Sequence, residues 1–176
     1  EGAPVLAAGD TLDEGALVVL GDGVEATVTF ADGGPMDLIG PARVTLAEMT
    51  PYMRRVDVSV GQVNRFEVKD VTTGIHTPYE TFVAVQNGTV GVNVQRDEVT
   101  YNLFEGNDAK VVDLAEGSRG LTVLTQDTPY VVTRAPAGDT PMDSGMMEPA
   151  GAGNSRTIRV GQRTVRLTPR DRKSVV

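Results

Sequence analysis

The sequence contains no cysteine, no tryptophan and a single histidine among its 176 residues. Without cysteine the chain can form no disulfide, thiol nucleophile or zinc–thiolate centre. The lone histidine, His76, cannot build a multi-histidine metal site. Aromatic residues make up only 5% of the chain, so valine, leucine, isoleucine and alanine must fill its core. Such a core suits thin β-layers better than a deep globular centre.

Long apolar runs are also absent. No stretch approaches the roughly 20 residues of a membrane-spanning helix, which predicts no membrane insertion. The formal net charge of −8 disfavours nucleic acid and anionic lipid as partners of the whole chain. The sequence begins with Glu1 rather than methionine, and we interpret this as the result of signal-peptide removal, with a trimmed chain as the alternative. We therefore expect an extracytoplasmic protein that is secreted, periplasmic or on the cell surface.

The patterns that are present indicate β-structure. Twenty glycines and ten prolines mark many turns. Val56, Val58 and Val60 alternate with polar residues, which is typical of a half-buried strand. Between Val63 and Phe66 the apolar spacing changes phase, and this predicts a β-bulge. No segment has a convincing 3.6-residue period. The predicted fold is all-β, with short antiparallel strands in a sandwich-like or solenoid-like domain over residues 1–135.

Turn signals set the expected strand boundaries. The stretch 25–46 is interpreted as three short strands, separated by a reversal at 32–34 and a break at Gly40-Pro41. Gly61-Gln62 is expected to break another pair of strands. Hairpin connections are expected at 86–88 and 95–98. The remaining strands are expected at 16–20, 63–68, 82–85, 90–94, 99–104, 109–114, 121–124 and 130–133.

The composition changes abruptly after Ala135. Residues 136–155 are rich in glycine, alanine and proline, which predicts a linker. Residues 156–176 carry a net charge of +6, against −14 for residues 1–155, and 156–168 has a strand pattern with a change of phase near Gly161-Gln162. This tethered strand could add to a sheet edge of another molecule, fold back on its own domain, or be a disordered basic end. The residues predicted to dock are Ile158, Arg159, Val160, Arg163, Val165, Arg166 and Leu167.

The motifs that suggest catalysis have simpler explanations. Asp143-Ser144-Gly145 has the letters of an aspartic-protease motif but lies in the predicted linker, without the paired, buried carboxylates that this chemistry needs. His76 has no serine on a G-x-S-x-G elbow to activate, so it is interpreted as a turn residue. Asn87-Gly88-Thr89 is a glycosylation sequon but also an ordinary hairpin turn. We expect no enzyme, no catalytic residue and no cofactor.

Acidic residues in the turns could bind calcium through their oxygens. No EF-hand or calcium-solenoid spacing is present, so the simpler interpretation is that they serve as turn residues and edge charges. These residues are Asp10, Asp13, Glu14, Asp22, Asp32 and Asp37.

Four phrases in order resemble the extracytoplasmic domain of the FecR family over about residues 5–125. They are "LAAGDTLDEGALVVLGDGVEATVTFADGGPMDLIGPARVTL", "VDVSVGQVNRFEV", "HTPYETFVAVQNGTVGVNV" and "VTYNLFEGNDAKV". The resemblance implies a non-catalytic β-domain outside the cytoplasm. The best-known members relay a signal from an outer-membrane receptor to a cytoplasmic sigma factor. This sequence differs from them: it contains no N-terminal helical sigma-binding region and no membrane span, and Asn87-Gly88-Thr89 replaces the usual "R-G-T".

These observations lead to a main functional hypothesis and two alternatives. The main hypothesis is a non-enzymatic secreted structural protein that self-assembles, its C-terminal strand docking on the β-domain of a neighbouring copy to form a filament or surface array. The first alternative is a periplasmic protein-binding or signal-relay module of FecR type that recognises another envelope protein. A hydrolase or carbohydrate-active domain is the weakest alternative.

Overall fold

The computed structural model describes residues 9–32, 34–115 and 120–134, together with the backbone of 156–160 and 163–167. All regular structure in these ranges is β, so the predicted all-β fold is confirmed. The same ranges contain no helix of the length and apolarity that a membrane crossing requires. The strands are β1 (Leu17–Leu20), β2 (Glu25–Thr29), β3 (Pro35–Met49), β4 (Met53–Val68), β5 (Thr72–His76), β6 (Thr81–Val94), β7 (Glu98–Asp113), β8 (Gly120–Val123), β9 (Tyr130–Thr133), β10 (Arg156–Val160) and β11 (Arg163–Leu167).

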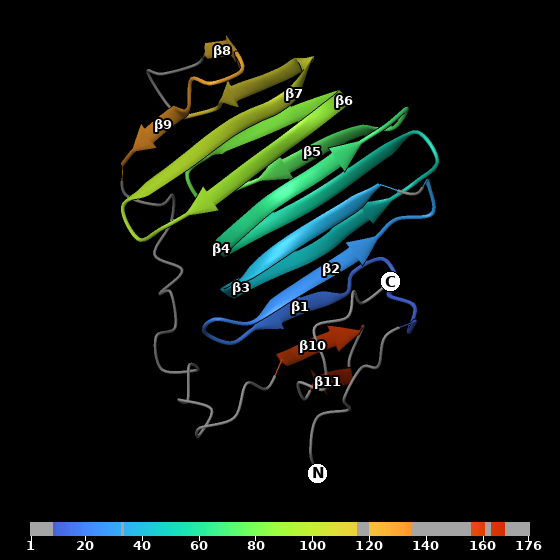
Figure 1. Ribbon diagram of the computed structural model, residues 1–176. Helices are drawn as coiled ribbons and strands as arrows, with labels where there is room; N and C mark the ends of the chain where they lie inside the picture. Colours follow the sequence, from blue (N-terminus) through green and yellow to red (C-terminus); the bar gives the residue numbers. More distant parts are fainter. Residues whose placement is uncertain (1–8, 33, 116–119, 135–155, 161–162, 168–176) are drawn as a thin grey trace.

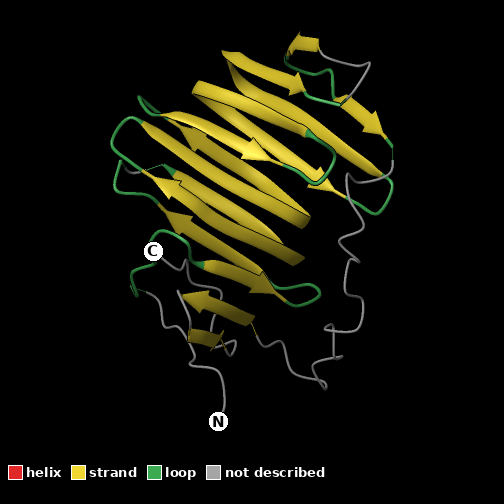
Figure 2. Ribbon diagram, turned by 180° about the vertical axis from the view of Figure 1, so that it is seen from behind, coloured by secondary structure: helices red, strands yellow, loops and turns green. Residues whose placement is uncertain are grey.

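Four long strands connect two facing layers of one continuous sheet (Figure 1 and Figure 2). The first layer runs from β2 through one half each of β3, β4, β6 and β7 to β9. The second layer runs from β11, β10 and β1 through the other halves of these strands, with β5 between β4 and β6, to β8. The pairings are antiparallel except for that of β4 with β5, which is parallel. The result is a sandwich whose layers share their backbone.

Glycines lie where the long strands pass from one layer to the other. Gly61 in β4 has a φ of 100°, and Gly106 in β7 has a φ of 92° and pairs with Gly88 of β6. In β3 the bend falls at Gly40-Pro41, a cis peptide. The expected break at Gly40-Pro41, the break at Gly61-Gln62 and the hairpin at 86–88 are therefore wrong. These glycines let the strand bend without ending its pairing.

Two other local predictions are confirmed. Val63 pairs with Leu38 while Phe66 pairs with Met36, and the register shift between them is the bulge expected from the apolar spacing. The 95–98 connection is a hairpin closed by a hydrogen bond from the Gln95 amide to the Glu98 carbonyl at 2.8 Å. In both cases the deciding signal lies within a few residues of the chain.

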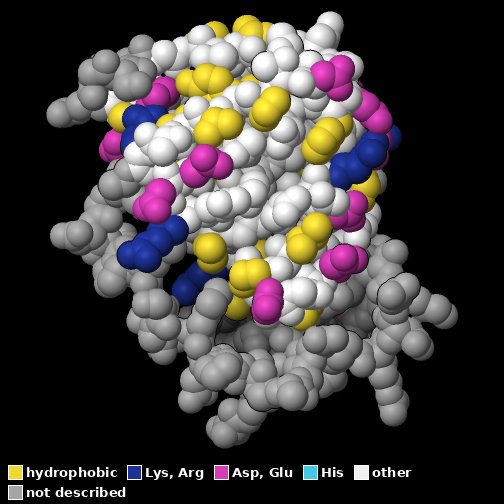
Figure 3. Space-filling view, turned by 60° about the vertical axis from the view of Figure 1, so that its left-hand side comes forward, with side chains coloured by type: hydrophobic (Ala, Val, Ile, Leu, Met, Phe, Trp, Pro, Cys, Tyr) yellow, Lys and Arg dark blue, Asp and Glu magenta, His cyan; other side chains and the backbone are white. Residues whose placement is uncertain are grey.

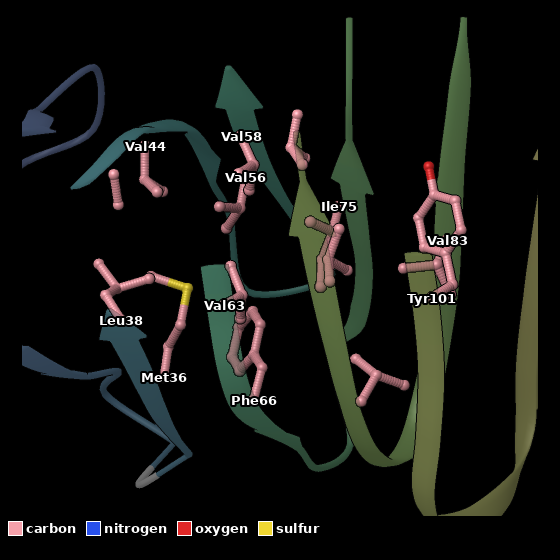
Figure 4. Packing of buried hydrophobic residues seen from close by; sticks show 14 of the residues in the cluster. Met36, Leu38, Val44, Val56, Val58, Val63, Phe66, Ile75, Val83 and Tyr101 are labelled. Carbon is pink, nitrogen blue, oxygen red and sulfur yellow. The ribbon is translucent and has the colours of Figure 1, made fainter. Parts of the chain in front are cut away.

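The core fills the space between the two layers, as Figure 4 shows. Alternate residues of each strand point inward because successive side chains of a strand lie on opposite faces. Met36, Leu38 and Phe66 come from the first layer and meet Val44 and other aliphatic residues of the second (Val56, Val58, Ile75 and Val83). Each side chain of this size contributes about 1.5–3 kcal/mol on burial.

The C-terminal strands form a hairpin beside β1. Val18 of β1 pairs with Ile158 of β10, which in turn pairs with Val165 of β11. The expectation of one strand through Gly161-Gln162 is wrong, because the change of phase separates two antiparallel strands. In this structure β10 extends the sheet of its own chain, which is the second of the three alternatives. The predicted linker (136–155) and the side chains of the tail lie outside the described residues, so the domain division and the docking residues stay predictions.

Candidate functional site

Exposed apolar side chains gather at the end of the sandwich formed by β8 and its connection from β7. Leu114 is 55% exposed, Leu121 is 62% exposed and Val123 is 53% exposed. We call these three residues the β8 patch. Leu121 and Val123 alternate with Thr122, whose partner Val111 points into the core, so both lie on the outer face of the second layer. Figure 1 shows β8 at the border of the stacked strands.

An apolar row leads from the β8 patch across the outer face. Leu121 pairs with Val112 of β7, Val112 pairs with Phe82 of β6, and Phe82 pairs with His76 of β5. The rings of His76 and Phe82 are stacked, with centroids 4.5 Å apart and planes 8° from parallel. The imidazole lies over Gly74, where a Cβ atom would come within 3.2 Å of its Nε2. Four strands thus present one half-buried apolar surface to the outside.

His76 is the one titratable residue in this row. Burial lowers the pKa of the imidazole, and the nearby Arg55 cation lowers it further, while Asp57 opposes them. Arg55 and Asp57 are themselves joined by two hydrogen bonds of 2.8 and 3.1 Å. His76 is therefore neutral at pH 7. Sequence analysis took it for a turn residue, but the structure places it at the end of β5 against an aromatic ring.

The lowered pKa of His76 predicts a pH-dependent stability. The unfolded chain takes up a proton near pH 6.5, whereas the folded protein does so only at lower pH. The neutral ring stabilises the folded protein fully above pH 6.5. This stabilisation is lost as the pH falls from 6.5 toward the lower pKa that His76 has in the folded protein. Urea unfolding between about pH 7.5 and pH 5 should show a small decrease in the free energy of unfolding toward acid pH. A His76→Gln variant should lack this decrease. Parallel pH profiles for the two proteins would contradict this.

A buried charge cluster joins the two layers at the turn between β2 and β3. Arg54 of β4 is 5% exposed, and its Nη2 donates to Asp32 at 2.7 Å. The guanidinium carbon lies 4.0 Å from the centroid of the Phe30 ring. Nη1 has no hydrogen-bond partner among the described residues. Sequence analysis missed this residue, although Arg54 shares the parity of the buried Val56 and Val58.

A hollow of about 300 Å³ lies beside the bends of β3 and β4 and the β6–β7 hairpin. Pro41, Gly61 and Gln95 mark its three sides, and none of its lining residues is charged or carries a hydroxyl or imidazole group. Figure 3, in which the left-hand side of Figure 1 comes forward, shows acidic and basic side chains interspersed with single apolar ones. This hollow supplies shape but no acid, base or nucleophile.

The other residues singled out in the sequence lie apart from the β8 patch. Asp32 is the partner of Arg54, Asp37 accepts a hydrogen bond from Thr27 at 2.6 Å, and Glu14 accepts one from the Met49 amide at 2.8 Å. Across the described ranges, no three histidine, aspartate or glutamate side chains come together as metal ligands. The Asp143-Ser144-Gly145 motif falls outside those ranges. The row behind the patch was missed because its register joins residues from four strands.

Two solved structures share the fold. Both are crystal structures of a "putative anti-sigma factor" from Parabacteroides distasonis ATCC 8503, determined at 2.50 and 1.65 Å resolution. They superpose with TM-scores of 0.56 and 0.57 at 20% and 19% sequence identity. Each match covers 66% of this chain and 54% of the other, so the similarity spans about half of that protein. No protein-family model and no curated protein matches the sequence.

These comparisons correct the main functional prediction. The hypothesis of a self-assembling filament or array protein is wrong, because the two structures that share this fold are described as putative anti-sigma factors. The placement of β10 on β1 of the same chain also gives the C-terminal strand an acceptor within its own sheet. The fold is a β-sandwich that this chain shares with the two solved structures.

Proposed function

We propose that this chain is an extracytoplasmic protein-binding module of FecR type, which relays a signal by binding another protein of the cell envelope. The observation that carries the proposal is the fold shared with the two structures described as putative anti-sigma factors. The four FecR-like phrases of the sequence support it. Binding requires an accessible surface that a partner can cover, and the β8 patch with the row behind it is such a surface.

The proposed role requires no catalysis. The hollow beside Pro41 has no acid–base pair along its lining, and His76 is held in a ring stack on the outer face. We therefore propose a module that acts through affinity alone. A turnover assigned to the purified protein and abolished by His76→Ala would contradict this part of the proposal.

Transcription in the organism that carries the gene tests the relay. Deleting the gene should change the expression of one sigma-factor-dependent set of genes, because the relay between envelope and sigma factor is broken. Restoring the gene should reverse the change, and total RNA sequencing measures both. An unchanged transcript profile across growth and envelope-stress conditions, with the protein shown to be produced in the parent strain, would contradict a signalling role.

A further inference from the structure

The outer edge of β8 has no strand beside it in the described part of the chain. The strand order of the second layer ends at β8, which pairs only with β7. The Leu124 amide donates to the Ala109 carbonyl at 2.9 Å, continuing this ladder beyond the strand. Because hydrogen-bonded and non-hydrogen-bonded pairs alternate in an antiparallel ladder, the backbone groups of Leu121 and Val123 point away from β7. Two amides and two carbonyls therefore face the open edge.

The side chains at this edge are apolar as well as exposed. Leu121 and Val123, the two residues with outward backbone groups, are also more than half exposed. A further strand would place its own side chains opposite them, at cross-strand Cβ distances of about 4.5–5.5 Å. Val112 and Phe82 would continue the same apolar surface behind Leu121. The edge offers main-chain pairing and side-chain burial at the same two residues.

Charged residues or proline lie in or beside the two edge strands of the first layer. Edge strands commonly carry charges or proline, which discourage pairing with a further strand. β2 presents Glu25 with Thr27 and Thr29 on its outer face. β9 is bounded by Pro129 and by Arg134, which forms an ion pair with Asp113 at 2.6 Å. The four residues of β8, like those of β9, include no charge and no proline, but only in β8 are two outward-facing backbone positions occupied by residues that are more than half exposed.

We propose that β8 accepts an extended segment of a partner protein as the next strand of the second layer. The segment carries apolar residues at alternate positions, where they cover Leu121 and Val123, and its backbone bonds to the four outward groups of these residues. This inference rests on the proposed function, since it names the surface and the kind of partner segment through which the module binds. The partner segment must therefore be an extended strand with a free edge and apolar residues at alternate positions.

A synthetic strand tests the edge directly. The probe is a heptapeptide that alternates valine and threonine between two terminal lysines, added to the full-length chain. Amide hydrogen exchange, followed by NMR, should slow by about tenfold at Leu121 and Val123 when the probe saturates, because each outward amide gains a hydrogen bond. The Thr122 amide, which already faces β7, should not change. The same peptide N-methylated on its valines cannot pair and should give no protection.

Variants at Val123 separate the backbone from the side chain. Val123→Pro removes an outward amide without removing a bond to β7, and proline is tolerated at such edge positions. Val123→Thr keeps the amide and nearly the same shape. We expect binding of the probe to be lost in Val123→Pro and retained, though weakened, in Val123→Thr. Equal binding by both variants, with unfolding midpoints close to that of the parent, would overturn strand addition.

Two other outcomes also overturn the proposal. Protection of Leu121 and Val123 without peptide, rising with protein concentration together with a dimer mass in light scattering, would assign the edge to a second copy. Absence of protection at millimolar peptide would show that the edge does not accept a strand. Neither outcome depends on transcription. If the transcript profile is unchanged but the peptide binds, the proposed function fails and this inference stands. If the transcript profile changes but the peptide does not bind, this inference fails and the proposed function stands.

Discussion

Replacing Gly61 with alanine is expected to destabilise the fold by about 3–5 kcal/mol, a large part of the stability of a domain of this size. Gly61 has a φ of 100°, which side chains rarely adopt. A Cβ atom there would also meet the Pro41 carbonyl oxygen and lie 2.5 Å from the Ala42 Cα. Both obstacles are backbone atoms of β3, so no side-chain rotation relieves the contact. Urea unfolding followed by circular dichroism measures the loss.

Gly23→Ala is the matched control. Gly23 has a φ of 65°, but a Cβ atom there meets nothing within 4 Å. Its substitution should cost only the conformational term of about 1–2 kcal/mol. The difference between the two variants in the free energy of unfolding is the cost of separating β3 from β4 at the bend. Equal losses for Gly61→Ala and Gly23→Ala would show that the close approach at Gly61 is not needed for the fold.

Asp32→Ala is expected to destabilise the protein by about 3 kcal/mol, because it leaves the Arg54 guanidinium buried without its counter-ion. The side chain of Arg54 is 6% exposed and that of Asp32 is 19% exposed, which places the loss at the lower end for a buried pair. Adding Arg54→Met should recover about 1–2 kcal/mol, since methionine fills the space between the layers without a charge. Thermal or urea unfolding of Asp32→Ala, Arg54→Met and the double variant completes the cycle.

Asp57→Ala provides the comparison for this pair. Asp57 binds Arg55 at 2.8 Å, but the two side chains are 33% and 48% exposed. Loss of such a surface pair should cost less than about 1 kcal/mol. Equal losses in the free energy of unfolding for Asp32→Ala and Asp57→Ala would contradict this explanation. So would a further loss when Arg54→Met is added to Asp32→Ala, because removing the buried charge should restore stability.

The sequence predicts the local parts of this fold because their signals are local. Alternation around Val56 and Val58 identifies strand and buried face, and the spacing from Val63 to Phe66 identifies the bulge. The four residues of β9 lie at the predicted positions 130–133. In each case neighbouring residues determine the outcome, whatever the rest of the chain does.

The bends could not be predicted in the same way. A glycine permits a reversal and a bend equally, and the choice depends on which strand lies alongside. Gly88 continues β6 because it pairs with Val68 on one side and Gly106 on the other. These partners are far away in the sequence. The sequence therefore predicted several short strands where the protein has fewer long ones.

The candidate site depends on register even more strongly. Leu121, Val112, Phe82 and His76 come into line only when four strands are paired with a particular offset. A shift of one residue in any strand would turn its side chain into the core. Composition and motifs contain no information about such an offset. Arg54 is different, since its parity with Val56 was readable in the sequence.

The division of β7 between the two layers has a mechanical consequence. One half of β7 pairs with β8 and the other half pairs with β9, so both edge strands are bonded to one continuous strand. At Gly106, between the halves, a Cβ atom would lie 2.7 Å from the Asn87 carbonyl oxygen, so β6 approaches β7 closely at this bend. Because β7 is one continuous strand, a displacement of the half that pairs with β8 is passed along the backbone to the half that pairs with β9.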